Sequence, residues 1–319
     1  MNTKYAYVTG AVLISLTVLS SCDFESKAKK SKKFCEVGYT EFEAKDYTQS
    51  LADYNKAIAL DSTNGNAFEG KGSDEYHLNH NEAALNDELT ALRLNPELKN
   101  VRSWIGLIKS EMGDYRGSIE YYNKSIELGG DLGKDYEGRG ADEYYLGDFD
   151  KAMQDETKAI QIDPEAENAY YWRAMTKENL GDYKGALEDH KKSLEKGANK
   201  GKDYEGMAAD ENYLEDNAKA LEYINMAIAS DTTLKNAYNW RGRIRQEMED
   251  YKGSADDYTM SLKIVANKGR DYEGRAVSEY YLKDYSNALN DINMAIQSDT
   301  TLKKAQAWKE EILSSMRKG

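Results

Sequence analysis

The stretch that decides the fold is YYWRAMTKENLGDYKGALEDHKKS, residues 170–193. It contains three small residues, Ala174, Ala186 and Ser193, separated by 12 and then 7 positions. These three slots recur every 34 residues between residues 38 and 295, and every one is filled by Gly, Ala or Ser. Such a period predicts stacked helix pairs, because small side chains let helix backbones approach where they cross.

The period and its residues resemble the tetratricopeptide repeat, a helix–turn–helix unit of about 34 residues. Repeat five shows the match, with Tyr170, Ala174, a Gly-Asp-Tyr turn at residues 181–183, and Ala186. Position 7, which is usually Leu in the family, is mostly basic here.

The resemblance implies an all-α fold, a right-handed α-solenoid of eight helix hairpins over residues 31–302, followed by a capping helix over residues 303–319. Positions within a repeat are numbered 1–34, with helix A expected from about position 2 to position 14. The eight repeats begin at Ser31, Gly65, Lys99, Gly133, Glu167, Gly201, Lys235 and Gly269.

The amino terminus is typical of a processing signal. An apolar stretch over residues 6–19 is too short to span a bilayer and is followed by small residues. Residues 19–22, LSSC, resemble a bacterial lipobox, in which Cys22 is acylated and becomes the first mature residue. We expect a signal peptide over residues 1–21 and a lipidated basic linker over residues 22–30. The alternative is an ordinary secretory signal in which Cys22 is incidental.

This reading places the protein in a bacterial cell envelope, anchored to a membrane by its lipid, at the outer membrane or periplasmic face rather than in the cytoplasm. The formal net charge of −14 argues against binding nucleic acid through a general basic surface. The exception is local, in the lysines Lys27, Lys29, Lys30, Lys32 and Lys33. They would either attract anionic headgroups, at about 1 kcal/mol per lysine, or form a solvated linker.

A second period of 68 residues, two repeats long, distinguishes odd from even repeats. Position 6 is tryptophan in repeats 3, 5 and 7 and in the cap, at Trp104, Trp172, Trp240 and Trp308. The same position in the even repeats is Gly70, Gly138, Gly206 and Gly274. In the family, positions 2, 5, 6, 9, 12 and 13 of helix A line a concave groove. Either each Trp lies over a neighbouring Gly and fixes the helical pitch, or the indoles form platforms about 20 Å apart for a ligand.

Acidic and aromatic residues fill the other groove positions of the even repeats. Position 5 is Glu69, Glu137, Glu205 and Glu273. The aromatic residues at positions 12 and 13 include Tyr76, Tyr144, Tyr145, Tyr213, Tyr280 and Tyr281. This surface suits a protein or peptide with basic and apolar groups, although a solvated polar face is an equally good interpretation. The chaperone-binding members grip a carboxylate with basic and amide side chains at positions 2, 5, 6 and 9, and Glu and Gly at positions 5 and 6 make that activity unexpected here.

Positions 7 and 23 lie symmetrically about the turn of a hairpin, so their side chains should face each other. A basic residue at position 7 coincides with Asp at position 23 in five repeats: Lys71 with Asp87, Arg139 with Asp155, Arg173 with Asp189, Arg241 with Asp257, and Arg275 with Asp291. Where position 7 is apolar, position 23 is usually Tyr, as in Ile105 with Tyr121 and Met207 with Tyr223, and only Val37 with Asp53 departs from this rule. We predict partly buried ion pairs.

The sequence offers no pattern typical of catalysis, of a cofactor site or of a metal site. His77, His80 and His190 form no zinc-type pair, and we expect the first two to be solvated near a turn. Cys35 is expected to be a small helix residue, because lipidation of Cys22 leaves it without an internal disulfide partner. We therefore do not expect the protein to be an enzyme.

The function that this pattern favours is a membrane-anchored adaptor that holds a partner protein or peptide in its groove. Tetratricopeptide lipoproteins of this layout include pilotins and envelope-assembly factors, and the resemblance does not choose among them. The alternative is a lipoprotein whose Trp and Tyr rings stack on carbohydrate or cell-wall fragments. The sequence leaves the oligomeric state open.

Overall fold

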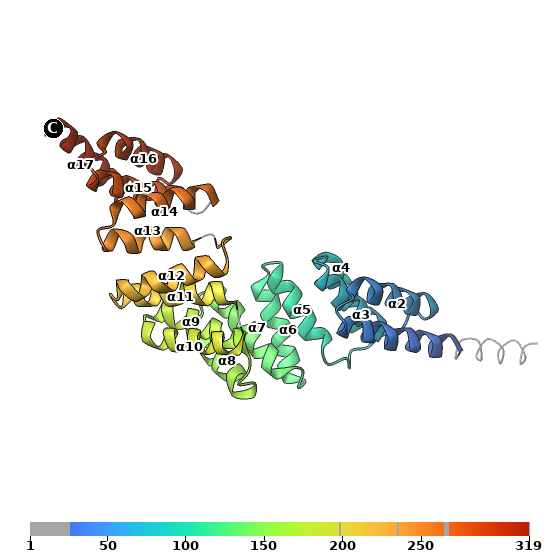
Figure 1. Cartoon of the computed structure of the whole chain (residues 1–319). Helices are drawn as coiled ribbons and strands as arrows, with labels where there is room; N and C mark the ends of the chain where they lie inside the picture. Colours follow the sequence, from blue (N-terminus) through green and yellow to red (C-terminus); the bar gives the residue numbers. More distant parts are fainter. Residues whose placement is uncertain (1–25, 198, 235, 265–267, 319) are drawn as a thin grey trace, which may run out of the picture. The chain divides into compact units, whose positions relative to one another are not determined.

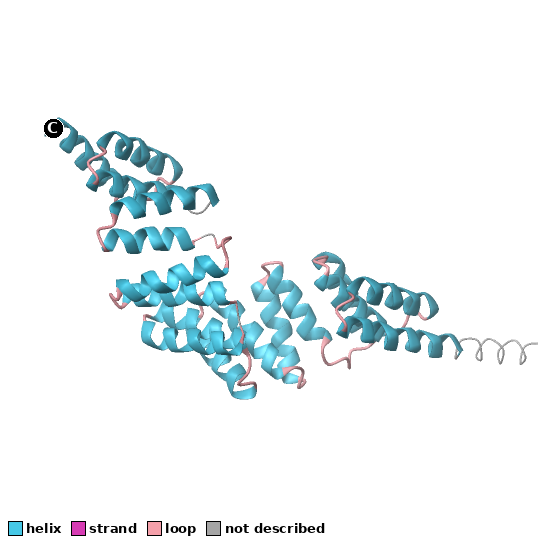
Figure 2. Ribbon diagram, viewed as in Figure 1, coloured by secondary structure: helices cyan, strands magenta, loops and turns pink. Residues whose placement is uncertain are grey.

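The computed structural model describes residues 26–197, 199–234, 236–264 and 268–318, and within these ranges every regular element is an α-helix (Figure 1 and Figure 2). The chain divides into two compact units, Met1–Ile162 and Asp163–Gly319. Each unit is a stack of helix hairpins, which confirms the predicted all-α solenoid fold.

The described part of the first unit begins with a helix over residues 26–43. It continues with α2 (Tyr47–Leu60), α3 (Gly65–His77), α4 (Asn81–Leu94), α5 (Val101–Glu111), α6 (Tyr115–Glu127), α7 (Leu132–Tyr145) and α8 (Phe149–Ile162).

The second unit continues the alternation, in which odd labels mark A helices and even labels mark B helices. It consists of α9 (Glu167–Leu180), α10 (Tyr183–Lys196), α11 (Lys200–Tyr213), α12 (Asn217–Ser230), α13 (Ala237–Glu247), α14 (Tyr251–Ile264), α15 (Lys268–Tyr281), α16 (Tyr285–Ser298) and α17 (Ala305–Lys318). The last helix lies within the segment predicted as the cap, and it buries Ala305 and Ile312 against the preceding repeat.

The described helix over residues 26–43 differs from the predicted boundary at its start. The described residues are already helical at residue 26, five positions before Ser31 and inside the segment expected to be a linker. Lys27, Lys29 and Lys30 are therefore exposed residues of a helix and do not belong to an irregular tether. Cys22 and the predicted signal peptide lie outside the described residues.

The small slots hold the two helices of a hairpin in close contact. Ala174 and Ala186 are fully buried, and so is Ser193. Where the second slot is Ser, its hydroxyl donates to the backbone carbonyl of the first slot, as Ser118 does to Gly106 at 2.7 Å. Such a bond between two helices requires a small residue on both, which explains the residue types at these positions.

In repeat 5, the turn between helices A and B consists of a left-handed residue followed by a capping Asp. Gly181 has φ +82°, and the side chain of Asp182 then accepts a hydrogen bond from the backbone N–H of Gly185 at 3.0 Å. An Asp at the N-cap satisfies a backbone donor of the first helical turn. This turn reverses the chain and sets helix B against helix A.

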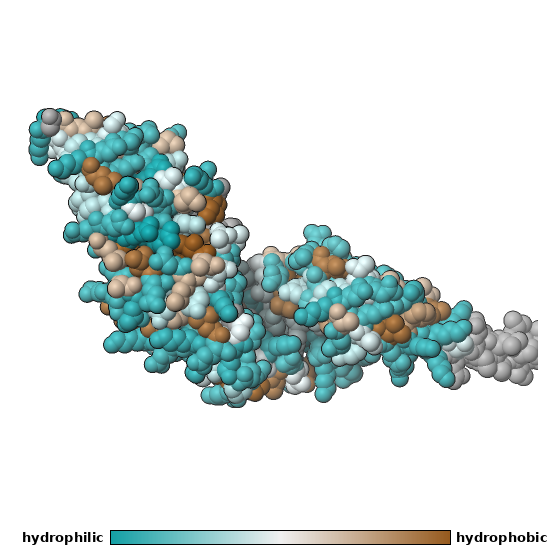
Figure 3. Space-filling model, in the orientation of Figure 1, coloured by the Kyte–Doolittle hydropathy of each residue, from teal (hydrophilic) through white to brown (hydrophobic). Residues whose placement is uncertain are grey.

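Within each unit, helix B packs against its own helix A and against the A helix of the next repeat. Neighbouring A helices also touch, as α3 and α5 do in the first unit and α11 and α13 in the second. On the face shown in Figure 3, polar residues surround small separate apolar patches. Among the described residues, no helix has both the length and the apolar character needed to cross a bilayer.

Candidate functional site

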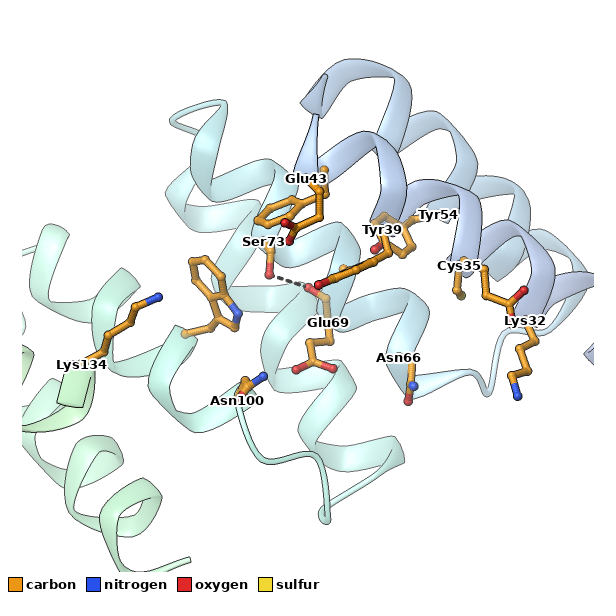
Figure 4. Close-up of a pocket in the computed structure, with 14 residues that line it drawn as sticks. Lys32, Cys35, Tyr39, Glu43, Tyr54, Asn66, Glu69, Ser73, Asn100 and Lys134 are labelled. Atoms are coloured by element: carbon orange, nitrogen blue, oxygen red, sulfur yellow. Dashed lines mark hydrogen bonds between the residues drawn. The ribbon is translucent and has the colours of Figure 1, made fainter. Parts of the chain in front are cut away.

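A groove in the first unit collects the A-helix side chains of four successive repeats. Its volume is about 620 Å³, and it lies against the helix over residues 26–43, α3, α5 and the start of α7 (Figure 4). Apart from Tyr54, its lining residues occupy positions 2, 5, 6, 9, 12 and 13: Lys32, Cys35, Glu36, Tyr39, Phe42, Glu43, Asn66, Glu69, Gly70, Ser73, Asn100, Trp104 and Lys134. Glu69 and Trp104 thus lie in a groove built from the positions that the sequence indicated.

The groove combines carboxylates with aromatic rings. In Figure 4, Lys32 and Lys134 lie at its opposite ends, and Glu43 and Glu69 lie between them. Burial raises the pKa of Glu69 above its usual value. Tyr39 is 60% exposed, so its ring is accessible to a partner. The groove can therefore accept both apolar and cationic groups.

The thiol of Cys35 also lines the groove, and it is held in its protonated form. Burial raises its pKa to about 11, and a thiol is nucleophilic only as the thiolate. The Nδ2 of Asn64 donates to its sulfur at 3.4 Å. Cys35 is therefore mostly protonated at neutral pH and contributes shape to the groove.

All four tryptophans are half-buried. Trp104, Trp240 and Trp308 contact aromatic residues at positions 12 and 13 of the preceding repeat. The ring centroid of Trp104 lies 5.7 Å from that of Tyr76 and 5.9 Å from that of His77. The corresponding separations are 6.1 Å for Tyr213–Trp240 and 5.6 Å for Tyr280–Trp308. Trp172 packs edge-on against Tyr171 at 5.4 Å.

The aromatic residue at position 13 of each even repeat stacks on the tyrosine at position 17 of the preceding odd repeat. The four pairs are Tyr47–His77, Tyr115–Tyr145, Tyr183–Tyr213 and Tyr251–Tyr281, with centroids 4.4, 4.8, 4.6 and 4.5 Å apart. His77 is therefore part of an aromatic cluster, and it is still exposed, as expected. His80 is exposed and bonds to Glu75 at 2.6 Å. In three of the pairs the position-13 ring is about half exposed, at 52%, 47% and 48%.

Position 6 of the even repeats must be glycine because a buried side chain of the preceding B helix fills the space beside it. That side chain is not the tryptophan that the sequence suggested. A Cβ at Gly70 would lie 2.1 Å from the ring of Tyr54, and a Cβ at Gly138 would lie 2.4 Å from the hydroxyl of Tyr122. His190 and Tyr258 fill the same space beside Gly206 and Gly274. These four residues share position 24 of helix B in the odd repeats, and all are buried. The hypothesis that each Trp lies over the neighbouring Gly is corrected accordingly.

The glutamates at position 5 are half-buried in all four even repeats. Burial raises the pKa of Glu205 to about 7 and also raises the pKa of Glu273. Glu137 is likewise half-buried on α7. On the same helix, the ring centroid of Tyr144 lies 5.7 Å from that of Phe149. These carboxyl groups are therefore less solvated than a purely surface ladder would be.

All five predicted ion pairs between positions 7 and 23 are present. Lys71 Nζ lies 3.0 Å from Asp87 Oδ2. The four arginine pairs are bidentate, with the terminal nitrogen 2.9, 2.7, 2.6 and 2.9 Å from Oδ1 for Arg139 with Asp155, Arg173 with Asp189, Arg241 with Asp257, and Arg275 with Asp291. Asp53, which faces Val37, takes Lys56 of its own helix as its partner instead.

The pairs are partly buried, as predicted, and their two partners are buried unequally. Asp189, Asp257 and Asp291 are only 4%, 2% and 3% exposed, and Asp87 and Asp155 are buried as well. Their basic partners at position 7 are half-buried. The difference follows from side-chain length, because a short Asp stays between the helices whereas a long basic side chain extends towards solvent. The aspartates therefore depend on their partners for charge compensation.

Three of these arginines also reach the helix B of the preceding repeat. Arg241 donates to Asn225 Oδ1 at 2.9 Å, and Arg275 donates to Thr259 at 3.1 Å. Arg139 bonds to Asn123 in the same way. Each guanidinium thus ties three helices together, so these pairs serve stability.

The second unit shows which kind of group the groove aromatics attract. The guanidinium of Arg243, at position 9 of repeat 7, lies 5.2 Å from the ring centroid of Trp240 and 5.5 Å from that of Tyr213. A cation over an aromatic face is stabilised by the ring quadrupole. The tryptophan at this position therefore already holds a cation of the chain itself.

A protein-family model described as tetratricopeptide repeat matches residues 101–128, which contain the hairpin of α5 and α6. The stacked hairpins and this match together support a tetratricopeptide-repeat protein. Its fold is similar to that of one chain in the Cut9–Hcn1 hetero-tetramer of the APC/C, with a TM-score of 0.67 at 14% identity over 84% of this chain and 52% of that chain. At such identity the likeness shows the fold alone.

A tetratricopeptide-repeat protein from Parabacteroides merdae gives a TM-score of 0.57 at 17% identity, over 78% of this chain and 99% of that chain. Among curated proteins, the small glutamine-rich tetratricopeptide repeat-containing protein of Dictyostelium discoideum is 32% identical over 33% of this chain and 32% of its own length. A heat-shock protein cognate co-chaperone of Aspergillus fumigatus is 26% identical over 35% of this chain and 33% of its own length. The chain spans about a third of the length of these curated relatives.

Sequence reasoning missed a cluster in the second unit of this repeat protein. Glu178, His190 and Asp210 each bring a ligand atom within 4.8 Å of the others. Their separations in sequence match no metal-binding motif, because they come from three successive helices. A column-by-column comparison of the repeats would have shown the signal, since His190 stands where the other odd repeats have Tyr.

Proposed function

We propose that this protein is a non-enzymatic adaptor that binds an extended segment of a partner protein in the groove of its first unit. The observation that carries the proposal is the groove itself, whose lining falls on positions 2, 5, 6, 9, 12 and 13 of successive A helices. A row of parallel A helices presents side chains at regular intervals, which suits a peptide that crosses several repeats.

The partner segment we propose carries basic and apolar side chains. Glu69 is half-buried, and Glu36 and Glu43 line the same groove, so a cation there gains charge partners. The place of Arg243 over Trp240 supports this chemistry, because it is the arrangement that a basic partner residue would adopt over Trp104. A partner held by a terminal carboxylate is not expected, since Glu69 occupies position 5.

The test is binding of synthetic peptides to the folded chain, measured by calorimetry. One set alternates Lys or Arg with Leu or Phe, and a matched set replaces the basic residues with Glu. We expect the basic set to bind, and Trp104→Ala and Glu69→Gln each to weaken binding by about tenfold, or about 1.4 kcal/mol. Glu120→Gln on the exposed face of α6 is the control and should change nothing. Equal binding by both peptide sets, or by the groove variants, would refute the proposal.

Carbohydrate is the second candidate ligand. The half-exposed rings of Tyr145, Tyr213 and Tyr281 favour it, because sugar faces stack on exposed aromatic rings. Oligosaccharides that bind the chain, with affinity lost in Tyr213→Ala and kept in Glu69→Gln, would select this candidate over the adaptor.

We also propose that the protein is attached to a bacterial membrane by lipid on Cys22. Support comes from the LSSC sequence at residues 19–22 and from the basic residues that follow it. The exposed lysines of the helix over residues 26–43 would face anionic headgroups near such an anchor. Metabolic labelling with a palmitate analogue tests the proposal. Label should be lost in Cys22→Ser and retained in Cys35→Ser, and label that survives Cys22→Ser would contradict it.

A further inference from the structure

We propose that Glu178, His190 and Asp210 form a binding site for a divalent first-row transition-metal ion in the second unit. Glu178 lies on α9, His190 on α10 and Asp210 on α11, and their ligand atoms are within 4.8 Å of one another. Nε2 of His190 lies 3.0 Å from Oε1 of Glu178. One ion can therefore contact all three side chains after small movements.

A second carboxylate orients the imidazole for such a role. Nδ1 of His190 lies 2.9 Å from Oδ1 of Asp203, and the hydroxyl of Ser193 donates to Oδ2 of Asp203 at 3.0 Å. With its Nδ1 proton directed to Asp203, the neutral ring presents the Nε2 lone pair toward Glu178 and Asp210. Burial lowers the pKa of His190, but its bonds to Asp203 and Glu178 outweigh this and raise the pKa to about 9, so an ion that binds Nε2 displaces a proton. A carboxylate behind the coordinating histidine is a common supporting interaction in metal sites.

The environment of the Asp210 side chain points to a bound ligand. This side chain is fully buried, and neither carboxylate oxygen has a hydrogen-bond partner. A buried carboxylate without a partner is strongly unfavourable, and buried charges are normally paired or bound to metal. A divalent cation would give both Asp210 and Glu178 a counter-charge, and with a neutral His190 the three side chains and the ion sum to zero charge.

The ligand set indicates the class of ion. Imidazole suits zinc, copper, iron and nickel, whereas carboxylates also suit manganese, so one nitrogen and two carboxylates favour zinc or manganese. The side chain of Glu178 is 19% exposed, while His190 is fully buried. An ion would thus enter past Glu178, and water would complete the coordination shell.

The cluster occurs once among the equivalent positions of the described repeats. The corresponding residues are Phe42, Tyr54 and Asp74 in repeats 1 and 2, Ser110, Tyr122 and Asp142 in repeats 3 and 4, and Gln246, Tyr258 and Ser278 in repeats 7 and 8. These natural alternatives supply substitutions that the fold tolerates at each position. An ion at this site would link three successive helices and stabilise the second unit.

The test uses the full mature chain, stripped with a chelator and titrated with zinc chloride or manganese chloride in a calorimeter. We expect one saturable site per chain and a rise in Tm with excess ion. His190→Tyr, which restores the residue of the other odd repeats, should lower the affinity at least a hundredfold while the helical signal is retained. Asp203→Asn should weaken binding by about tenfold. The exposed residue His80 is the control, and His80→Gln should bind as the wild type does.

The absence of a saturable site in the wild type would overturn the proposal. The same affinity in His190→Tyr would also overturn it, because the ion would then be held by surface carboxylates. A gain-of-function variant sharpens the test. Repeats 7 and 8 already contain the supporting pair, since Ser261 donates to Asp271 at 3.0 Å. Gln246→Glu with Tyr258→His and Ser278→Asp should raise the stoichiometry from one ion to two, and a folded triple variant that still binds one ion would contradict the assignment.

Discussion

The hydroxyl of Tyr122 on α6 occupies the space beside the backbone of Gly138 on α7, where a Cβ would approach it to 2.4 Å. The same ring lies 2.9 Å from the place of a Cβ on Gly106, so two A helices hold it from both sides. Tyr122 is only 3% exposed. Position 24 of an odd repeat thus determines which residue the next A helix can have at position 6.

Gly138→Ala is therefore expected to destabilise the first unit. In an exposed helix the same change would stabilise by about 1 kcal/mol, but overpacking against a rigid buried ring costs about 1–3 kcal/mol. Urea denaturation of the single variant measures the result. In a Tyr122→Ser background the added methyl has room, so Gly138→Ala should there be neutral or stabilising. A more stable single variant would show that the ring can move aside.

The ion pairs give a second prediction about stability. Arg139→Met leaves Asp155 without its bidentate partner, and Asp155 is only 8% exposed, so the variant should lose about 3 kcal/mol. Arg139→Met with Asp155→Tyr recreates the apolar pair that repeat 6 has in Met207 and Tyr223. We expect this double variant to recover most of the loss in a thermal melt. If it melts no higher than Arg139→Met alone, positions 7 and 23 do not act as a pair.

Because several carboxyl groups are buried, we predict that the stability of the fold decreases as the pH rises. Burial raises the pKa of Asp74 to about 7 and that of Asp142 to about 6, and burial also raises the pKa of Glu143 and Glu279 to about 7. A group whose pKa is raised by folding stabilises the fold below its unfolded pKa, and this contribution is lost as the pH rises through the folded pKa. The Tm should therefore fall between about pH 5 and about pH 8.

Thermal melts of Asp142→Asn identify the source of that pH dependence. The asparagine can still accept the hydrogen bond that Ser110 donates to Asp142 at 2.6 Å, but it does not ionise. Its Tm should fall less steeply with pH than that of the wild type. Asp150→Asn, at an exposed residue of α8, should leave the slope unchanged. A wild-type Tm that rises over this range would contradict the prediction.

The repeat period was enough to predict the fold, because each small slot recurs with its neighbours at a fixed spacing. The five ion pairs could also be predicted, since Arg139 and Asp155 vary together with their counterparts in other repeats. The residue that packs against Gly138 could not be predicted. Trp and Gly alternate at position 6 of successive repeats, and this alternation suggested that they contact each other. The true partner, Tyr122, lies on the preceding B helix, and only the packing of two repeats brings it there.

The depth of burial of the ion pairs was not predictable from the same columns. Position 23 is Asp or Tyr in every repeat, and these residue types do not indicate how deeply a side chain is buried. The near-complete burial of Asp189, Asp257 and Asp291 was therefore not predicted. Their enclosure depends on how closely helix B approaches the helices on either side, and the pattern of one repeat does not contain that distance.

The groove was predictable in its positions and not in its details. Glu69 and Trp104 follow from the face of helix A, but the aromatic stacking of His77 on Tyr47 depends on how one hairpin meets the next. The metal cluster escaped notice for the same reason, since Glu178 and Asp210 come together only across three helices. Contacts between repeats are the part of the structure that a single-repeat pattern leaves undetermined.

Site-specific photo-crosslinking in the native cell tests most directly whether the groove of the first unit is where a partner binds. A photo-reactive residue is placed at Tyr39, an exposed groove position, or at Glu120, an exposed residue of α6 outside the groove. We predict that residue 39 crosslinks one defined protein through a basic and apolar segment, and that Trp104→Ala with Glu69→Gln abolishes the product. Crosslinking from residue 120 and not from residue 39, or a product at residue 39 that persists in the groove variant, would contradict this.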